Sequence, residues 1–127
     1  MNHKDKQFAG IWLDGKHALI ISKNQTTEFE ISARVAATDS QSGGSEHARN
    51  NGKHTEQLKY FKELSQQLTT FDEILVFGPG QAQEQLQHHL KEDAQFNGKQ
   101  ITLDTSGQLT DPQVIAKVRD FFKSRQS

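Results

Sequence analysis

Hydrophobic and polar positions over the first quarter of the chain follow the short-period pattern of β-strands. Apolar runs at residues 8–13 and 18–22 flank an Asp-Gly pair, which favours a tight hairpin because such a turn needs positive φ angles. Residues 26–31 alternate, with Phe29 and Ile31 on one face, as expected for a half-exposed strand. The sequence therefore predicts an antiparallel meander of three strands.

Helical and strand patterns alternate over the second half of the chain. From residue 53, apolar side chains recur at the spacing of one helix face, whereas residues 73–77 form the continuous apolar run of a strand buried on both faces. Thr110 before Pro112 is a typical helix start. The elements predicted here are helices over 53–68, over 81–92 and from 110 onward, and strands over 73–77 and 100–104. The core-facing positions expected on these helices are Leu58, Phe61, Leu64 and Leu68, then Ala82, Leu86 and Leu90, and finally Val114, Ile115, Val118, Phe121 and Phe122.

This order of elements predicts one α/β domain with a mixed five-stranded sheet. An antiparallel meander is followed by an α-β-α-β-α series, and right-handed crossovers place the fourth and fifth strands parallel to the first. Helices then cover the sheet faces, as in ribonuclease H-like folds. The 127 residues suit a single domain, and the polar residues 1–6 are expected to form a flexible tail.

Residues 32–52 show no periodicity and are rich in serine, glycine and asparagine. A structureless segment of about twenty residues within a compact domain is usually functional or disordered. We predict a long mobile loop whose tip contacts a partner; the alternative is a flexible surface linker with no target. The candidate contact residues are Gly43, Gly44, Ser45, His47, Arg49, Lys53 and His54.

Composition narrows the possible functions. The hydrophobic fraction of 32% predicts a thin core, which eight phenylalanines partly offset. A net charge of -1 argues against binding nucleic acid through a global positive field. The absence of cysteine excludes disulfides and thiolate metal sites, and no apolar run approaches the roughly 20 residues that span a bilayer. We expect a cytoplasmic protein with no membrane association.

Carboxylates and histidines give no strong metal site. Asp14 ends the first strand, where ribonuclease H-type nucleases hold a metal, but only Asp104 could approach it, and an Asp-Gly turn explains Asp14 as well. His88 and His89 are adjacent on a helix and point about 100° apart, which prevents easy chelation of one ion. No cofactor and no metal are therefore predicted.

Two further features have both a functional and a structural interpretation. Residues 78–80, Gly-Pro-Gly before a helix, could cradle a phosphate, but Pro79 removes one donor and a tight turn explains the pattern better. The basic end of the last helix could touch RNA, but cations there also stabilise the helix dipole. These basic residues are Lys117, Arg119, Lys123 and Arg125.

Three segments together resemble a known family. They are Gly10–Asp14 with His17–Ile20, Lys53–Phe61, and Ile74–Pro79 with Gln85, Leu86 and Leu90. In this order they resemble the middle domain of archaeal and eukaryotic class 1 peptide-chain release factors and of the Pelota surveillance factor. More closely, they resemble small stand-alone bacterial relatives of that domain, the translational machinery component-like family.

The resemblance implies a role in translation. In the release factors, a Gly-Gly-Gln loop tip enters the peptidyl-transferase centre and helps water attack the peptidyl-tRNA ester. This chain has Gly43-Gly44-Ser45 in the matching loop, so the glutamine is missing and peptide release is not predicted. The resemblance instead implies a ribosome-associated accessory or rescue factor that binds the ribosome or ribosomal RNA.

Three functional hypotheses remain open. The first is a non-enzymatic, translation-associated binding domain that uses the glycine loop. The second is a hydrolase of peptidyl-tRNA or RNA, whose catalytic residues are unknown and for which only His47, His54 or Asp14 could activate water. The third is a protein-interaction domain with no role in nucleic-acid binding. Because Glu28 and Glu30 discourage pairing of the third strand as a sheet edge, we expect a monomer.

Overall fold

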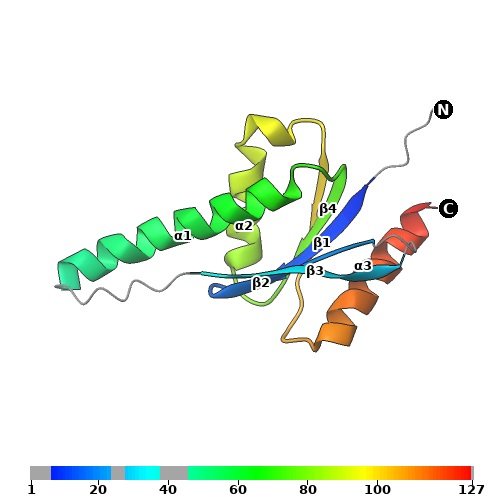
Figure 1. The fold of residues 1–127 in the computed structure, drawn as a ribbon, viewed down its shortest axis with the longest axis horizontal. Helices are drawn as coiled ribbons and strands as arrows, with labels where there is room; N and C mark the ends of the chain where they lie inside the picture. The colour runs from blue at the N-terminus through cyan, green and yellow to red at the C-terminus, as the bar shows by residue number, and fades with distance from the viewer. Residues whose placement is uncertain (1–6, 24–27, 38–45, 127) are drawn as a thin grey trace.

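Five strands and three long helices make up the described part of the chain, shown by the computed structural model in Figure 1. The structure describes residues 7–23, 28–37 and 46–126, and their side chains except those of 46–56 and 124–126. In chain order the elements are β1 (Phe8–Leu13), β2 (His17–Lys23), β3 (Phe29–Ala36), α1 (Glu46–Leu68), β4 (Glu73–Phe77), α2 (Ala82–Lys91), the 3₁₀ turn η1 (Ala94–Phe96), β5 (Gln100–Leu103) and α3 (Asp111–Gln126). The predicted N-terminal tail, 1–6, lies outside the described residues.

The sheet has the strand order β3-β2-β1-β4-β5. Strands β1, β2 and β3 pair antiparallel, while β4 is parallel to β1 and β5 is parallel to β4. The predicted mixed α/β sheet is confirmed, as is the position of the third strand at one edge.

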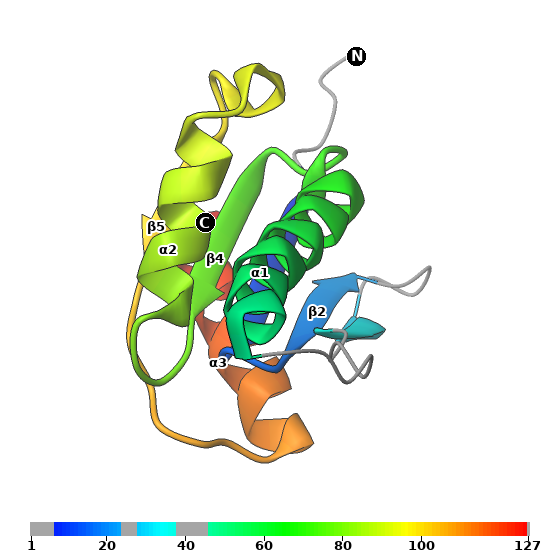
Figure 2. The ribbon, with the colours of Figure 1, turned by 90° about the vertical axis from the view of Figure 1, so that its left-hand side faces the viewer.

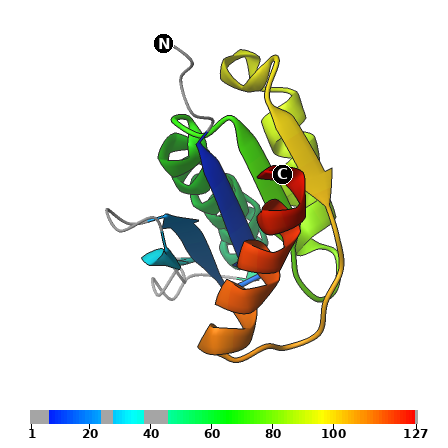
Figure 3. The same ribbon diagram turned by 90° about the vertical axis from the view of Figure 1, so that its right-hand side faces the viewer.

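Helices cover both faces of the sheet, with α1 and α2 side by side on one face and α3 alone on the other (Figures 2 and 3). Strand side chains alternate between two apolar clusters, as the pleat requires. The larger cluster joins β1, β2 and β4 to α1 and α2, and it includes Ile11, Ile20, Val76, Leu64 and Leu86. The smaller cluster lies under α3 and includes Trp12, Leu75, Phe77, Val118 and Phe122.

Glycines permit two close approaches of the backbone. A Cβ on Gly10 of β1 would overlap the side chain of Val118, so this glycine lets α3 lie close to the sheet. At the end of β4, a Cβ on Gly78 would overlap the carbonyl oxygen of Leu13. The first contact sets how closely α3 packs on the sheet and the second how closely the ends of β1 and β4 approach, which makes both positions sensitive to any larger side chain.

The third strand was predicted over 26–31 but runs from Phe29 to Ala36. Its register against β2 shifts by one residue: Ile31 lies opposite Ile21, and Ala33 lies opposite Ile20. Ser32 is therefore the additional residue of a β-bulge, and its hydroxyl donates to the carbonyl of Ile20 at 3.1 Å.

The bulge explains why the alternating sequence pattern stops after Ile31. Phe29 and Ile31 pack in the α3 cluster, whereas Ala33 and Val35 pack on the α1 side. All four have odd numbers, so an uninterrupted strand would place them on one face. A strict period of two cannot continue where the bulge moves odd-numbered residues to the other face. The predicted strand therefore ends too early.

The predicted loop over 32–52 is wrong at both ends. Residues 32–36 belong to β3, and α1 begins at Glu46 rather than at 53. Residues 38–45 lie outside the described residues. The first half of α1 extends beyond the sheet (Figure 1), and a helical segment with no core to face needs no apolar stripe.

The predicted core faces are confirmed for α2 and largely for the other helices. Phe61, Leu64 and Leu68 are buried, but Leu58 is 48% exposed, and Tyr60 takes the buried place with only 3% exposure. On α3, Val114, Val118 and Phe122 are fully buried, while Ile115 and Phe121 are partly buried. The stripe on α1 is therefore rotated slightly from the one predicted.

Candidate functional site

The predicted contact residues fall in the part of the sequence around the start of α1. Gly43, Gly44 and Ser45 lie outside the described residues, and His47, Arg49, Lys53 and His54 belong to the first half of α1. Positions 49 and 53 are one helical turn apart. The predicted mobile loop is therefore wrong for these four positions, because they belong to a helix. The first half of that helix extends beyond the sheet (Figure 1).

The β1–β2 hairpin holds Asp14 in a structural role. One carboxylate oxygen accepts the backbone N–H groups of Lys16 and His17 at 2.8 and 2.9 Å. The carbonyl of Asp14 accepts the hydroxyl of Tyr60 at 3.1 Å, which ties the hairpin to α1. Burial, and then the charge of Asp14, raise the pKa of Tyr60 above its ordinary value, so this phenol stays protonated.

Asp104 is engaged on the other side of the sheet. Its carboxylate lies 2.9 Å from the Nζ of Lys117 on α3. The hydrogen bond from Lys117, and then the backbone N–H of Thr105, lower the pKa of Asp104. Within residues 7–23, 28–37 and 46–126, no group of three His, Cys, Asp or Glu side chains could hold a metal ion. Asp14 and Asp104 therefore have structural partners.

The turn from β4 to α2 also has a structural explanation. The carbonyl of Gly78 accepts the N–H of Ser106 at 3.0 Å, which joins this turn to the segment after β5. Gln83, in the first turn of α2, is fully buried, and its side-chain amide has no hydrogen-bond partner in the described part of the chain. The sequence gives no signal of this burial, because glutamine is a residue type found mostly at the surface.

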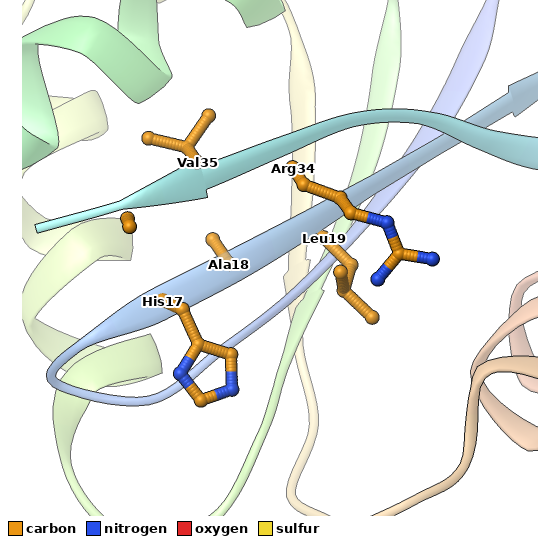
Figure 4. Close-up of a pocket in the computed structure, with 6 residues that line it drawn as sticks. His17, Ala18, Leu19, Arg34 and Val35 are labelled. Atoms are coloured by element: carbon orange, nitrogen blue, oxygen red, sulfur yellow. The ribbon is translucent and has the colours of Figure 1, made fainter.

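A pocket of 190 Å³ lies on β2 and β3, close to the hairpin (Figure 4). His17, Leu19 and Arg34 extend from one face of the two strands, and Val35 extends from the other (Figure 4). Arg34 pairs with Asp111 at the start of α3 at 2.6 Å, and the ring of His17 lies 5.5 Å from that of Trp12. Because Arg34 already has an acidic partner, this pocket is a poor site for an anion.

A groove of 450 Å³ lies between α1 and α2. His89 is half-buried there, with its ring 5.7 Å from the ring of Phe61. Gln57 donates from its amide to Gln85 across the two helices at 3.0 Å. The sequence gives no signal of this groove, because the groove depends on which helices become neighbours.

The described residues contain no helix with both the length and the hydrophobicity needed to cross a membrane. Comparison with known proteins found no matching family model and no matching curated protein. Similarity is instead found among solved structures.

Two of these structures are Pelota proteins. The one from Thermoplasma acidophilum aligns with a TM-score of 0.62 and 15% identity, over 91% of this chain and 32% of that one. The one from Archaeoglobus fulgidus aligns with a TM-score of 0.60 and 14% identity, over 97% of this chain and 36% of that one. The archaeal translation termination factor aRF1 aligns with a TM-score of 0.57 and 11% identity, over 94% of this chain and 39% of that one.

These similarities establish the fold. Nearly the whole chain superimposes, but it spans only about a third of the length of each of these proteins. At 11 to 15% identity, the comparison shows a shared backbone arrangement and carries no residue-level assignment. The chain therefore has the fold found in one part of Pelota and of archaeal aRF1.

Proposed function

We propose that this protein is a translation-associated accessory domain that binds the ribosome or ribosomal RNA and catalyses no reaction. The contact surface is the segment 43–54, which joins the glycine-containing loop to the first turns of α1. The proposal also places the protein in the cytoplasm, where ribosomes are found.

The observation that carries this proposal is the combination of the fold with the length of α1. Similar structures include an archaeal translation termination factor, and the Pelota proteins share the same arrangement. Helix α1 has 23 residues, and its first half extends beyond the sheet (Figure 1). A projecting helix can reach a cleft that the body of the domain cannot enter.

The charges of the segment suit a modest, salt-sensitive contact. Residues 43–54 include Arg49, Lys53 and two histidines against a single acid, Glu46. Each phosphate neutralised by a cation releases counterions, so affinity falls as salt rises. Because the segment has only two cations, we expect its affinity to depend less on salt than the affinity of proteins that contact many phosphates.

Two observations support the absence of catalysis. One is the sequence of residues 43–45, and the other is the set of contacts made by Asp14 and Asp104. The tip reads Gly43-Gly44-Ser45, without the glutamine of the release-factor motif. Asp14 is held by its hairpin and Asp104 by Lys117. A hydrolysis assay on peptidyl-tRNA and on RNA, with and without Mg²⁺, tests this point, and turnover in any of these conditions would contradict it.

Co-sedimentation with ribosomes at low and moderate salt tests the binding itself. We expect the protein to pellet with ribosomes at low salt, and the double variant Arg49→Glu with Lys53→Glu to bind at least about ten-fold more weakly. The matched control is Lys59→Glu with Lys62→Glu, which reverses two exposed lysines in the second half of the same helix. A wild-type protein that stays in the supernatant at both salt concentrations would refute the proposal.

We also propose that the domain acts as a monomer, with β3 at the edge of the sheet formed by the described residues. Sedimentation equilibrium should give the mass of a single 14.3 kDa chain. A stable dimer in the same buffer would show that an edge or face is covered by a second copy.

A further inference from the structure

The outer surface of the α1–α2 layer has an exposed apolar position. Leu58 is 48% exposed and is the only large apolar side chain classed as exposed among the described residues. Phe61 and the half-buried His89 lie beside it in the same groove. An exposed leucine over an aromatic floor leaves apolar area that a partner side chain could remove from water.

The rim of the groove on α2 is acidic. Glu84, His88 and Glu92 follow one another at four-residue spacing, so they form one stripe along the helix. His88 and Glu92 are 3.1 Å apart, and both glutamates are exposed. None of the described residues that line the groove is a lysine or an arginine.

The groove is a channel along two helices that run in the same direction. Gln57 meets Gln85, and four residues later Phe61 meets His89, so the contacts advance together along α1 and α2. The hydrogen bond from Gln57 to Gln85 crosses the groove near one end, and Glu92 lines it near the other. Figure 2 shows the two helices side by side on this surface. Such a channel suits a linear segment better than a compact small molecule.

We propose that the α1–α2 groove binds a basic segment of a partner protein. One aliphatic side chain of the segment packs on Leu58 and Phe61, and its lysines or arginines lie against Glu84 and Glu92. Charge complementarity selects this occupant, because carboxylates attract cations and repel the phosphates of RNA. The described residues that line this groove lie outside segment 43–54, so this inference does not depend on the proposed ribosome contact.

Fluorescence anisotropy with defined peptides tests the inference on the purified 127-residue chain. The probe is a labelled 14-residue amphipathic peptide of leucine, lysine and arginine. One comparison peptide has every leucine replaced by serine, and another has every basic residue replaced by glutamate. We expect the probe to bind, the serine peptide to bind at least five-fold more weakly, and the glutamate peptide not to bind.

Variants of the groove locate the binding. Leu58→Ser should weaken the probe about five-fold by removing the apolar contact, and Glu84→Lys with Glu92→Lys should weaken it about ten-fold or more. The matched control, Glu63→Lys with Asp120→Lys, reverses two exposed acids that do not line the groove and should leave affinity within two-fold. Circular dichroism and thermal melting test whether each variant is folded. We expect all of them to fold, because the substituted side chains are exposed.

Three outcomes would overturn the inference. One is the absence of probe binding up to about 1 mM, and another is equal weakening by the groove and control variants. The third is a single-stranded RNA oligonucleotide that binds the wild type and is lost in Leu58→Ser, because the groove would then be a nucleic-acid site. Ribosome pelleting of Glu84→Lys with Glu92→Lys separates the two proposals, since segment 43–54 is intact in that variant.

Discussion

The two halves of helix α1 have different environments although they share one continuous backbone. In the second half, Tyr60, Phe61, Leu64 and Leu68 are buried against the sheet. The first half extends beyond the sheet and includes the stretch Arg-Asn-Asn-Gly at 49–52, in which asparagine and glycine are poor helix formers. Tertiary packing therefore stabilises the second half of α1, and the first half continues the helix beyond the packed region.

This difference matters for function because it separates the stable body from the part that reaches outward. Most helical stability in proteins comes from packing an apolar face, and short isolated helices are marginal in water. Because the first half of α1 extends beyond the sheet, we expect a change in its conformation against a partner to cost the rest of the fold little. A contact surface built there can adapt without unfolding the domain.

A proline in each half should give the largest difference between them. Lys62→Pro breaks the helix where it packs and should lower the free energy of unfolding by about 3 kcal/mol or more. Asn51→Pro should cost less than about 1 kcal/mol, because the helix can restart there with proline in its first turn. Urea denaturation of both variants measures the two values.

The comparison of the prolines has a direct control. Circular dichroism at low temperature should show that Asn51→Pro loses a few helical residues while keeping a cooperative transition. Equal losses of stability in the two variants would mean that the first half of α1 is coupled to the core after all.

A smaller effect is expected where α1 meets the β1–β2 hairpin. Tyr60→Phe removes the hydroxyl that donates to the carbonyl of Asp14 and should cost about 1 kcal/mol at neutral pH. Because burial raises the pKa of Tyr60, the neutral phenol contributes stability below its unfolded pKa, near 10, which is lost as pH rises through the folded pKa. The wild type should therefore lose more stability than Tyr60→Phe between neutral and strongly alkaline pH.

Thermal melting across this pH range provides the measurement. Parallel losses in the two proteins would show that the hydroxyl is not buried in solution. A Tyr60→Phe variant more stable than the wild type at neutral pH would show that the hydrogen bond does not form.

The smallest effect is expected at a surface ion pair away from α1. Asp104→Asn weakens the pairing with Lys117 and should cost no more than about 0.5 kcal/mol, because the carboxylate is largely exposed and screened by solvent. The pKa of Asp104 is lowered, so its contribution is present above the unfolded pKa, near 3.8, and is lost as pH falls through the folded pKa.

Denaturation of the wild type and Asp104→Asn at neutral pH and near pH 2 tests this prediction. The difference in stability should disappear in acid. A loss of several kcal/mol at neutral pH would mean that ion pairs, rather than apolar burial, hold α3 on the sheet.

The fold was largely predictable because its strongest signals are local. The Asp-Gly hairpin, the apolar run at 73–77 and the spacing of apolar residues on the helices each need only a few neighbouring residues. The rule of right-handed crossovers then leaves few arrangements of the sheet. The candidate site was less predictable, since Gly43, Gly44 and Ser45 stand in a segment with no periodicity at all.

By itself, the sequence determined the order of the elements, the mixed sheet and most of the core, because the periodic spacing of apolar residues predicts which positions are buried. Only the tertiary structure decided the bulge at Ser32, the burial of Tyr60 instead of Leu58, and the extension of α1 to Glu46. Each of these three features depends on which strand or helix packs against the residue, and local sequence does not specify that neighbour. The groove between α1 and α2 has the same origin, since it exists only where two helices distant in sequence pack side by side.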